Sequence, residues 1–357
     1  MLKLKIGLIG CGGIMNGVHA PAYQKMDNVE VVAACDILID RAQRMADTFG
    51  FAKDRCFEDF HDLLALDDLD AVDIATPNNM HSVIAVAALE KGLHVFCEKP
   101  DAVSVVEVQK MQAAAKQSGK HLMVMRNNRF MAGSQFLKQY IADGNMGEIY
   151  TARCGWRRRR GIPGKGGWFT TKAKSGGGPL IDLGVHMIDL SMWLMGNPKP
   201  VAVSGCTYRK FADDTAQADS EHAKFGDAVQ NGVFDVEDLC MGFIRFENGA
   251  CMQIEFSWAS NIEMENKFFD LRGTKAGARY SSVDEKFKIF TEQYGRNLDL
   301  APAVPDSMGP HEANLRHFVD VVLNEVTPIF EPEQGVEMVK ILEAIYQSAQ
   351  TGREVLL

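Results

Sequence analysis

Hydrophobic residues in the first third of the chain form short runs, and the segments between those runs have the spacing of amphipathic helices. A helical pattern follows the first run up to about residue 26, and further ones cover about 78–91 and 104–118. Strands that alternate with helices in this way predict a doubly wound parallel sheet of the α/β class. The runs that have the length of buried strands are 4–10, 29–36, 71–75, 93–97 and 121–125.

The pattern changes after a helical segment at about 133–143, because no helices separate the apolar runs that follow. These runs are rich in β-branched and aromatic residues, and strands without intervening helices favour antiparallel pairing. The turn Glu247-Asn248-Gly249 indicates a hairpin, and two helices at about 311–325 and 333–351 close the chain. The strands predicted here cover residues 148–157, 200–209, 234–247, 249–260 and 265–272.

The change of pattern predicts two domains, residues 1–127 and residues 128–357, with the last helices able to pack back on the first domain. Between two predicted strands lies a polar segment, 212–232, that lacks apolar periodicity. We interpret this segment as a mobile excursion that could border a pocket.

Composition narrows the class of protein. A content of 46% hydrophobic and 24% charged residues is typical of a globular protein with a core, and the formal net charge of −9 argues against nucleic acid or an anionic membrane as a partner. No apolar run approaches the roughly 20 residues needed to span a bilayer, and the N-terminus has no signal-peptide pattern. The eight cysteines contain no Cys-x-x-Cys pair, so we expect free thiols and a cytoplasmic protein.

The first strand ends in Gly10-Cys11-Gly12-Gly13, and a helix, a second strand and Asp36 follow. This is the order of a dinucleotide-binding βαβ unit: Gly10 allows a tight turn, Gly12 lets the backbone approach a pyrophosphate, and the helix offers its first amides to that charge. Met15 stands where the usual motif has its third glycine, which affects packing more than phosphate binding. A plain glycine-rich loop is the alternative interpretation.

Asp36 lies about 25 residues after the turn, where a carboxylate can accept hydrogen bonds from the ribose hydroxyls of the cofactor. A carboxylate repels a 2′-phosphate, and residues 37–39 supply no cation. The sequence therefore predicts NAD in preference to NADP.

Two later strands end on polar residues, and ligands of doubly wound sheets bind at such strand ends. Thr76-Pro77-Asn78 and His81 follow the third predicted strand, and Glu98-Lys99-Pro100 follows the fourth. Asn78 can also cap the next helix. Pro100 restricts Lys99 to an extended conformation, which would aim a cation at the cofactor cleft, although a solvated lysine has the same local pattern.

The stretch GGGPLIDLGVHMID, residues 176–189, places three ionisable side chains in an apolar helix that runs from Pro179 to Gly196. Asp182, His186 and Asp189 stand at i, i+4 and i+7 and would share one face. Catalysis, a metal site and a structural polar stripe all remain open for this pattern. The absence of further His or Cys ligands nearby argues against metal, so we predict none.

Taken in order, Gly10–Ile14, Thr76-Pro77-Asn78 with His81, Glu98-Lys99-Pro100 and the 176–189 stretch resemble the glucose–fructose oxidoreductase / inositol dehydrogenase / MocA family over essentially the whole chain. The resemblance implies a Rossmann domain followed by an α+β domain with a large, open, mainly antiparallel sheet. It implies Lys99, Asp182 and His186 as catalytic residues beside the nicotinamide. The expected cofactor-binding residues are Gly10, Gly12, Gly13, Ile14, Asp36, Thr76, Asn78, His81, Glu98 and Lys99.

Further polar and aromatic residues are candidates for substrate contacts. Asn128 and Arg129, at the end of the last strand of the first domain, could bind hydroxyls. Four consecutive arginines, 157–160, fit salt bridges and subunit contacts, or substrate contact through one or two of them such as Arg158. Trp168, in a glycine-rich loop, could stack on a sugar or pack under the loop.

The resemblance implies an NAD-dependent dehydrogenase of a secondary alcohol in a sugar, polyol or glycoside, with C3 of a glucose-type ring as the narrower expectation. Two alternatives stay open: a glycosidase that uses tightly held NAD⁺ for transient oxidation, and a non-catalytic sugar or NAD sensor. The expected partner is a small-molecule substrate, and we expect a homodimer or homotetramer formed through the C-terminal sheet.

Overall fold

The computed structural model describes residues 3–213, 224–305 and 308–357, and the chain divides into two compact units. Unit 1 consists of residues 1–127 together with 308–336, and unit 2 consists of residues 128–307 together with 337–357. The first unit therefore contains a stretch near the C-terminus in addition to residues 1–127. Residues 214–223 of the polar segment predicted to be mobile lie outside the described residues.

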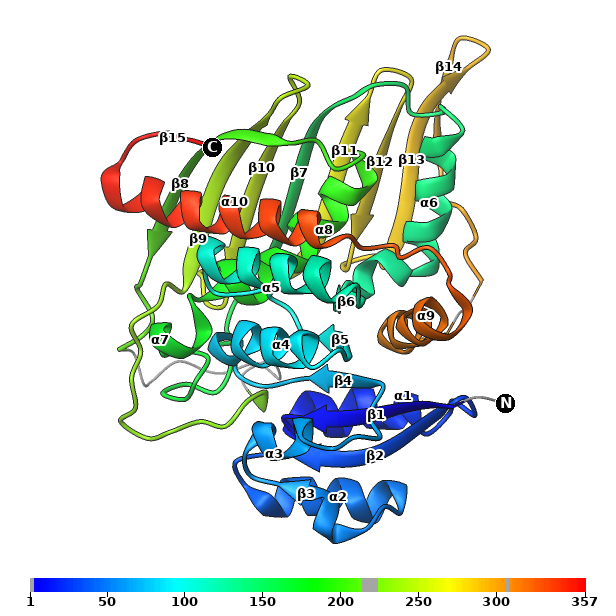
Figure 1. Cartoon of the computed structure of the whole chain (residues 1–357). Coiled ribbons are helices and arrows are strands. Elements are labelled where there is room, and N and C mark those ends of the chain that lie inside the picture. Colours follow the sequence, from blue (N-terminus) through cyan, green and yellow to red (C-terminus); the bar gives the residue numbers. More distant parts are fainter. Residues whose placement is uncertain (1–2, 214–223, 306–307) are drawn as a thin grey trace. The chain divides into compact units, whose positions relative to one another are not determined.

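Unit 1 is built on a six-stranded sheet in the order β3-β2-β1-β4-β5-β6 (Figure 1), and every pairing in it is parallel. This order is that of a doubly wound dinucleotide-binding fold and confirms the predicted parallel sheet. All residues of the central strand β4 are buried, as expected where helices cover both faces of a sheet. The strands are β1 Leu4–Ile9, β2 Val29–Cys35, β3 Cys56–Phe57, β4 Ala71–Ile74, β5 His94–Cys97 and β6 Leu122–Val124.

Helices α4, α5 and α9 of unit 1 lie where the periodicity predicted helices, whereas α2 and α3 were not among the predicted elements. Ser104 caps α5 by accepting a hydrogen bond from the Glu107 amide, and Gly119 ends that helix in the left-handed conformation. Phe318 of α9 packs against Phe96 of β5, which fixes the C-terminal stretch on this unit's core. The helices are α1 Ala20–Tyr23 with a preceding π-helical turn η1 Met15–His19, α2 Ile39–Phe49, α3 Phe60–Leu64, α4 His81–Glu90 with a 3₁₀ turn η3 Asn78–Met80, α5 Val105–Ser118 and α9 Pro310–Asn324.

Unit 2 is built on a nine-stranded sheet in the order β14-β13-β12-β11-β7-β10-β9-β8-β15. Its pairings are antiparallel except for β7 with β10, which run parallel. The predicted large, mainly antiparallel sheet is therefore confirmed, and the sequence pattern missed β12, β13, β14 and β15. The strands are β7 Ile149–Arg157, β8 Pro200–Tyr208, β9 Leu239–Phe246, β10 Cys251–Ser257, β11 Asn266–Gly273, β12 Ala276–Ser281, β13 Lys286–Gln293, β14 Arg296–Leu300 and β15 Val355–Leu356.

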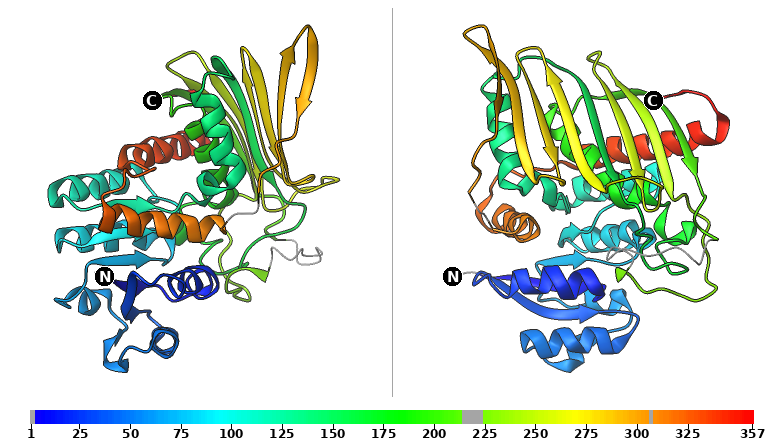
Figure 2. Two further views of the ribbon diagram at one scale, coloured as in Figure 1. Left: turned by 90° about the vertical axis from the view of Figure 1, so that its right-hand side faces the viewer. Right: turned by 180° about the vertical axis from the view of Figure 1, so that it is seen from behind.

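Two helices of unit 2, α6 and α8, lie on one face of this sheet, while the described residues place no helix on the other face (Figure 2). Helix α8 packs against β7 and β11, and all its residues except His186 are buried. Gly196 follows α8 in a left-handed conformation (φ 86°), as expected at a helix end. The helices are α6 Ala132–Ala142, α7 Lys172–Ser175, the π-helical turn η5 Leu180–Gly184, α8 Val185–Leu194 and the part of α10 (Pro332–Thr351) from residue 337 onward.

Within the described residues, no helix is both long and apolar enough to cross a membrane. All eight cysteines are free.

Candidate active site

The glycine turn of unit 1 has the geometry that phosphate binding requires. Gly10 has φ 88°, and a Cβ there would lie 2.6 Å from the carbonyl carbon of Ala75, so that only glycine fits. At Gly12 and Gly13 a Cβ would meet no atom within 4 Å, which leaves the backbone open to a ligand. The Asn16 side-chain amide donates hydrogen bonds to the carbonyl oxygens of Cys11 (2.6 Å) and Gly12 (2.9 Å) and holds the turn in shape.

Asp36 ties the end of β2 to this turn. Its Oδ2 accepts a hydrogen bond from the amide of Cys11 at 2.8 Å, and its Oδ1 accepts one from the amide of Leu38 at 2.9 Å. Each carboxylate oxygen can accept a second hydrogen bond, so the group can still receive a ribose hydroxyl. The structure thus places Asp36 next to the turn, where the spacing predicted it.

A buried network of charged side chains, His19, Asp73 and Glu98, is hydrogen-bonded to the backbone of Lys99, and the sequence analysis did not predict it. His19, in η1, is fully buried; its Nδ1 lies 2.8 Å from Oδ2 of Asp73 and its Nε2 lies 3.1 Å from Oε1 of Glu98. The Tyr23 hydroxyl donates a further hydrogen bond to Asp73 at 2.9 Å. Oε2 of Glu98 accepts a hydrogen bond from the backbone amide of Lys99 at 3.0 Å. The Glu98 carboxylate therefore connects His19, after the glycine turn, to the strand end that carries Lys99, and Asp73 holds the other side of the His19 ring.

Burial alone would lower the pKa of His19, but the charge of Asp73 and the hydrogen bonds to Asp73 and Glu98 raise it to about 10. Burial alone would raise the pKa of Glu98, but the hydrogen bond and charge of His19 lower it to about 2. The network is therefore an imidazolium held between two carboxylates at neutral pH.

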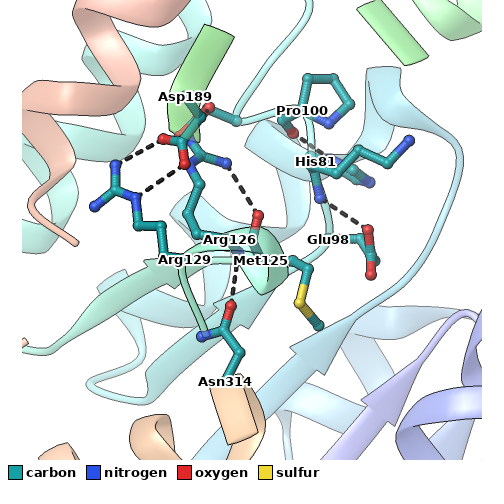
Figure 3. Close-up of polar contacts among 10 residues, drawn as sticks. His81, Glu98, Pro100, Met125, Arg126, Arg129, Asp189 and Asn314 are labelled. Carbon is teal, nitrogen blue, oxygen red and sulfur yellow. Dashed lines mark hydrogen bonds and ion pairs between the residues drawn. The ribbon is translucent and has the colours of Figure 1, made fainter. Parts of the chain in front are cut away.

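The residues around Thr76 form the next strand end. The ring of His81 is fully buried, with Nδ1 2.8 Å from the carbonyl oxygen of Pro100 (Figure 3). Its Nε2 lies 3.0 Å from the carbonyl oxygen of Thr76. This geometry gives His81 a scaffolding role that joins the ends of β4 and β5. Asn78 is buried in η3, and the hydroxyl of Thr76 is buried without a hydrogen-bond partner among the described residues. An unsatisfied buried hydroxyl at a strand end is a group that a ligand could satisfy.

In unit 2 the predicted regular helix begins with a π-helical turn, η5, that contains Asp182. Such turns often occur at functional sites. The indole Nε1 of the fully buried Trp258 donates a hydrogen bond to Oδ2 of Asp182 at 2.9 Å and orients the carboxylate. His186 follows in the first turn of α8 and is the one residue of that helix that is not buried.

Asp189 differs from the other two ionisable residues of this stretch. It is buried and forms a two-bond ion pair with Arg129, Nε to Oδ2 at 2.9 Å and Nη2 to Oδ1 at 2.6 Å (Figure 3). Arg129 is only 1% exposed, so this geometry favours a structural role for a residue that we expected to face the substrate. Asn128, also buried, donates to the carbonyl oxygen of His186 at 3.4 Å and supports the same helix.

Two of the three glycines before Asp182, Gly177 and Gly178, are explained by close approach of two other chain segments, while Gly176 ends α7 with a left-handed φ of 82°. Glu237 is buried and accepts hydrogen bonds from the amides of Gly178 (2.9 Å) and Leu180 (3.2 Å) and from the hydroxyl of Tyr346 (2.9 Å). A Cβ at Gly178 would lie 2.0 Å from the Glu237 carbonyl oxygen, and one at Gly177 would lie 1.9 Å from the Tyr346 hydroxyl. Burial raises the pKa of Glu237, and its hydrogen bonds work against that rise. Sequence reasoning missed Glu237 because it lies 59 residues beyond Gly178.

The remaining substrate candidates lie in unit 2. Trp168 stacks on Phe169 with ring centroids 3.8 Å apart, and Phe169 contacts Phe225, so these rings pack on one another within the loop. Arg158 is buried, and its guanidinium carbon lies 5.2 Å from the ring centroid of Trp156. Among residues 3–213, 224–305 and 308–357, no group of three or more His, Cys, Asp or Glu is placed to hold a metal ion.

A parallel sheet in this strand order, with an open glycine turn and an acidic residue beside it, defines a dinucleotide-binding protein. The comparisons with known proteins agree. Residues 4–126 match the NAD-binding Rossmann domain of the oxidoreductase family named for glucose–fructose oxidoreductase, inositol dehydrogenase and MocA, and residues 138–357 match its C-terminal α/β domain. The chain belongs to this family, which confirms the resemblance, the two-domain fold class and the prediction of an oxidoreductase.

Several relatives are similar over nearly their full length. A D-glucoside 3-dehydrogenase of Escherichia coli (strain K12) is 32% identical over 355 residues, which cover 99% of this chain and 97% of that protein. A levoglucosan dehydrogenase of Pseudarthrobacter phenanthrenivorans is 32% identical over 333 residues, 87% of this chain and 83% of that protein. Among solved structures, a levoglucosan dehydrogenase in complex with NADH superposes with a TM-score of 0.86 at 25% identity and covers 99% of each chain.

Proposed function

We propose that the protein is an NAD-dependent dehydrogenase that oxidises a secondary alcohol of a sugar, polyol or glycoside, with C3 of a glucose-type ring as its position of attack. The relatives named for D-glucoside and levoglucosan oxidation support the substrate class. The observation that carries the proposal is the start of α8, where Asp182, fixed by Trp258, comes one turn before the only residue of that helix that is not buried, His186.

In this proposal His186, in its neutral form, takes the proton of the substrate hydroxyl, because imidazole is the side chain that most often serves as a general base near neutral pH. Lys99 donates a hydrogen bond to the same oxygen and stabilises the negative charge that develops on it. Asp182, held by Trp258, orients the substrate or the imidazole. The bound nicotinamide accepts the hydride.

The described residues of unit 1 fit this cofactor. The backbone at Gly12 and Gly13 is open, the buried Thr76 hydroxyl lacks a partner among the described residues, and Asp36 keeps acceptor capacity beside the turn. The carboxylate of Asp36 would repel a 2′-phosphate, which supports NAD in preference to NADP. Ile14, Asn78, Glu98 and Lys99 remain proposed cofactor contacts or supports.

The test is NADH fluorescence on native protein incubated with NAD⁺ and a panel of sugars, inositols and glycosides. We expect NADH with at least one glycoside, and a loss of about 10²-fold or more in kcat for His186→Ala and for Lys99→Ala. His61→Ala, at an exposed histidine, and Lys53→Ala, at an exposed lysine, are matched controls that should keep the wild-type rate. Wild-type turnover in the His186 and Lys99 variants would refute the assignment of roles.

The same experiment separates the other two functions. A glycosidase that recycles its cofactor would release a free sugar without net NADH, and NAD(H) would leave the protein only on denaturation. A sensor would bind sugar and NAD(H) without turnover in any arm.

We also propose that the uncovered face of the unit 2 sheet binds a second copy of the chain. Strand register places Tyr208 and Met241 on the same face, and they are 45% and 44% exposed. Exposed large apolar residues on a sheet face are typical of an association surface. Light scattering should give a dimer or tetramer that Met241→Lys weakens; a monomeric wild-type protein would exclude this.

A further inference from the structure

Two cationic side chains lie on one aromatic ring next to His186. The ring is that of Trp156 in β7, whose centroid lies 6.0 Å from that of the His186 imidazole. The Arg158 guanidinium carbon lies 5.2 Å from the Trp156 ring centroid, and Nζ of Lys267 lies 5.1 Å from it. Lys267 and Trp156 are direct cross-strand partners of β11 and β7. All four residues belong to unit 2, so the cluster is formed within one compact body.

Lys267 carries a charge with no carboxylate to balance it. Its Nζ contacts the rings of Trp156 and Tyr280, at 5.1 and 5.8 Å from their centroids, and forms no ion pair or hydrogen bond with the described residues. Burial lowers the pKa of this lysine. Contacts with aromatic faces stabilise an ammonium by less than the desolvation of that charge costs. A half-buried ammonium with this environment is typical of a site that a ligand completes.

Arg158 points to the same conclusion. It is only 9% exposed, its Nη1 donates to the carbonyl oxygen of Gly161 at 3.2 Å, and its Nε is buried without a partner among the described residues. The negative charges of Asp182 and Glu265 act on the Arg158 guanidinium. Both carboxylates also have other partners: Asp182 accepts a hydrogen bond from Trp258, and Glu265 accepts one from the amide of Arg159 at 2.9 Å. These acids partly balance Arg158, whereas Lys267 remains uncompensated.

We propose that Lys267 and Arg158 bind an anionic substituent of the sugar substrate, a carboxylate or a phosphate, while the Trp156 ring packs against the sugar ring. This proposal rests on the proposed function and narrows its substrate class to acidic sugars or glycosides. A hydroxyl could accept from either side chain but would leave the charge of Lys267 unbalanced. A carboxylate or phosphate accepts from both donors and neutralises that charge.

The test compares three substrates that share one ring: methyl glucoside, its 6-carboxylate and its 6-phosphate. We expect the wild-type kcat/KM to be at least about tenfold higher for a charged substrate than for the neutral one, since charge-assisted hydrogen bonds are about twice as strong as neutral ones. The two charged arms distinguish carboxylate from phosphate. Equal or higher kcat/KM for the neutral glucoside would overturn the proposal.

Variants of Lys267 test whether this side chain causes the preference for a charged substrate. Lys267→Met should raise KM for the preferred charged substrate by about 30-fold and change kcat/KM for the neutral glucoside by less than about threefold, because only the charged contact is lost. Lys267→Arg should restore most of the preference. Lys286→Met, at an exposed lysine of β13 in the same sheet, is the matched control and should change neither value. Equal losses on charged and neutral substrates in Lys267→Met would contradict the proposal.

A binding measurement separates this proposal from the proposed function. Calorimetric titration of the full-length protein, in the presence of NADH, with the 6-carboxylate and the 6-phosphate needs no turnover. Binding that Lys267→Met weakens at least tenfold would support the anionic subsite even if no sugar were oxidised, which would refute the dehydrogenase alone. Turnover of a neutral glycoside, with no binding of either anion, would refute the subsite and leave the dehydrogenase standing.

Discussion

The buried imidazolium between Asp73 and Glu98 makes a prediction that depends on pH. The substitution His19→Gln keeps a side chain of similar size and removes the charge, which leaves two carboxylates in the core without their cation. Breaking a buried ion pair by removing one partner costs about 3–5 kcal/mol. A rise in the pKa of His19 from 6.5 to about 10 corresponds to about 5 kcal/mol, in the same range.

The sign of the pH dependence follows from the two pKa shifts. The pKa of His19 is raised, so its contribution to the free energy of unfolding is complete below pH 6.5 and is lost as the pH rises through about 10. The pKa of Glu98 is lowered from 4.5 to about 2, so its contribution is complete above pH 4.5 and is lost as the pH falls through about 2. Because both shifts report the same pair, they are not added. The difference between wild type and His19→Gln should therefore be largest between about pH 4.5 and 6.5.

Urea unfolding at pH 6, 7.5 and 9 measures this difference. It should shrink above pH 6.5 by about 1.4 kcal/mol per pH unit, or roughly 3 kcal/mol between pH 6 and pH 9. His61→Gln is the control, because His61 lies 2.7 Å from Asp59 but is largely exposed, and it should have little effect at any of these pH values. A stability difference for His19→Gln that is large but constant from pH 6 to pH 9 would show that His19 is neutral in the folded protein and would refute the reasoning.

Three further predictions concern the cofactor and the helix that carries Asp182. Asp36→Ala should lower kcat/KM for NAD⁺ in steady-state assays. It should also raise the ratio of kcat/KM for NADP⁺ to kcat/KM for NAD⁺ by at least about tenfold, since the repulsion of a 2′-phosphate is removed. Gly178→Ala should lower stability by about 1–3 kcal/mol in thermal unfolding, because its Cβ would lie 2.0 Å from the Glu237 carbonyl oxygen. Trp258→Phe removes the hydrogen bond to Asp182 and should lower kcat by about tenfold while leaving NAD⁺ affinity unchanged by fluorescence titration.

Local pattern predicted five of the six strands of unit 1, because each of these is a continuous apolar run, and missed β3, which has only two residues. It also located Gly10, Gly12 and Asp36, whose roles depend on one βαβ unit. The strands β12, β13 and β14 escaped it, because they are short, carry charged residues on one face and are joined by tight turns such as Tyr294-Gly295. The stretch 234–247 was read as one strand, whereas β9 begins only at Leu239, since Glu237 is committed to the amides before Asp182.

The supporting contacts of the site could not be predicted from local pattern. His19 meets Asp73 and Glu98 from 54 and 79 residues away, and their proximity follows from the strand order of the sheet. Local pattern also did not predict the π-helical turn at 180–184, nor the pairing of Asp189 with Arg129, which lies 60 residues earlier in the chain. A sequence pattern identifies these residues as ionisable, and the fold adds the contacts that hold them: Asp189 is paired with Arg129, and Asp182 accepts a hydrogen bond from Trp258.

The two units fix their proposed reactive residues by the same physical means. In unit 1, the Glu98 carboxylate accepts the backbone amide of Lys99, and in unit 2 the Glu237 carboxylate accepts the amides that precede Asp182. A buried carboxylate that is hydrogen-bonded to backbone amides restrains the main chain. It thereby fixes the position of the Cα atom that carries a reactive side chain, although the carboxylate itself does not touch the substrate. This arrangement explains the glycines at 177 and 178 in the sequence, because the absence of a side chain there permits the close approach of Tyr346 and Glu237. The glycine-rich start of the helix is therefore a point of tight contact, which is the opposite of the flexibility that three glycines in a row suggest.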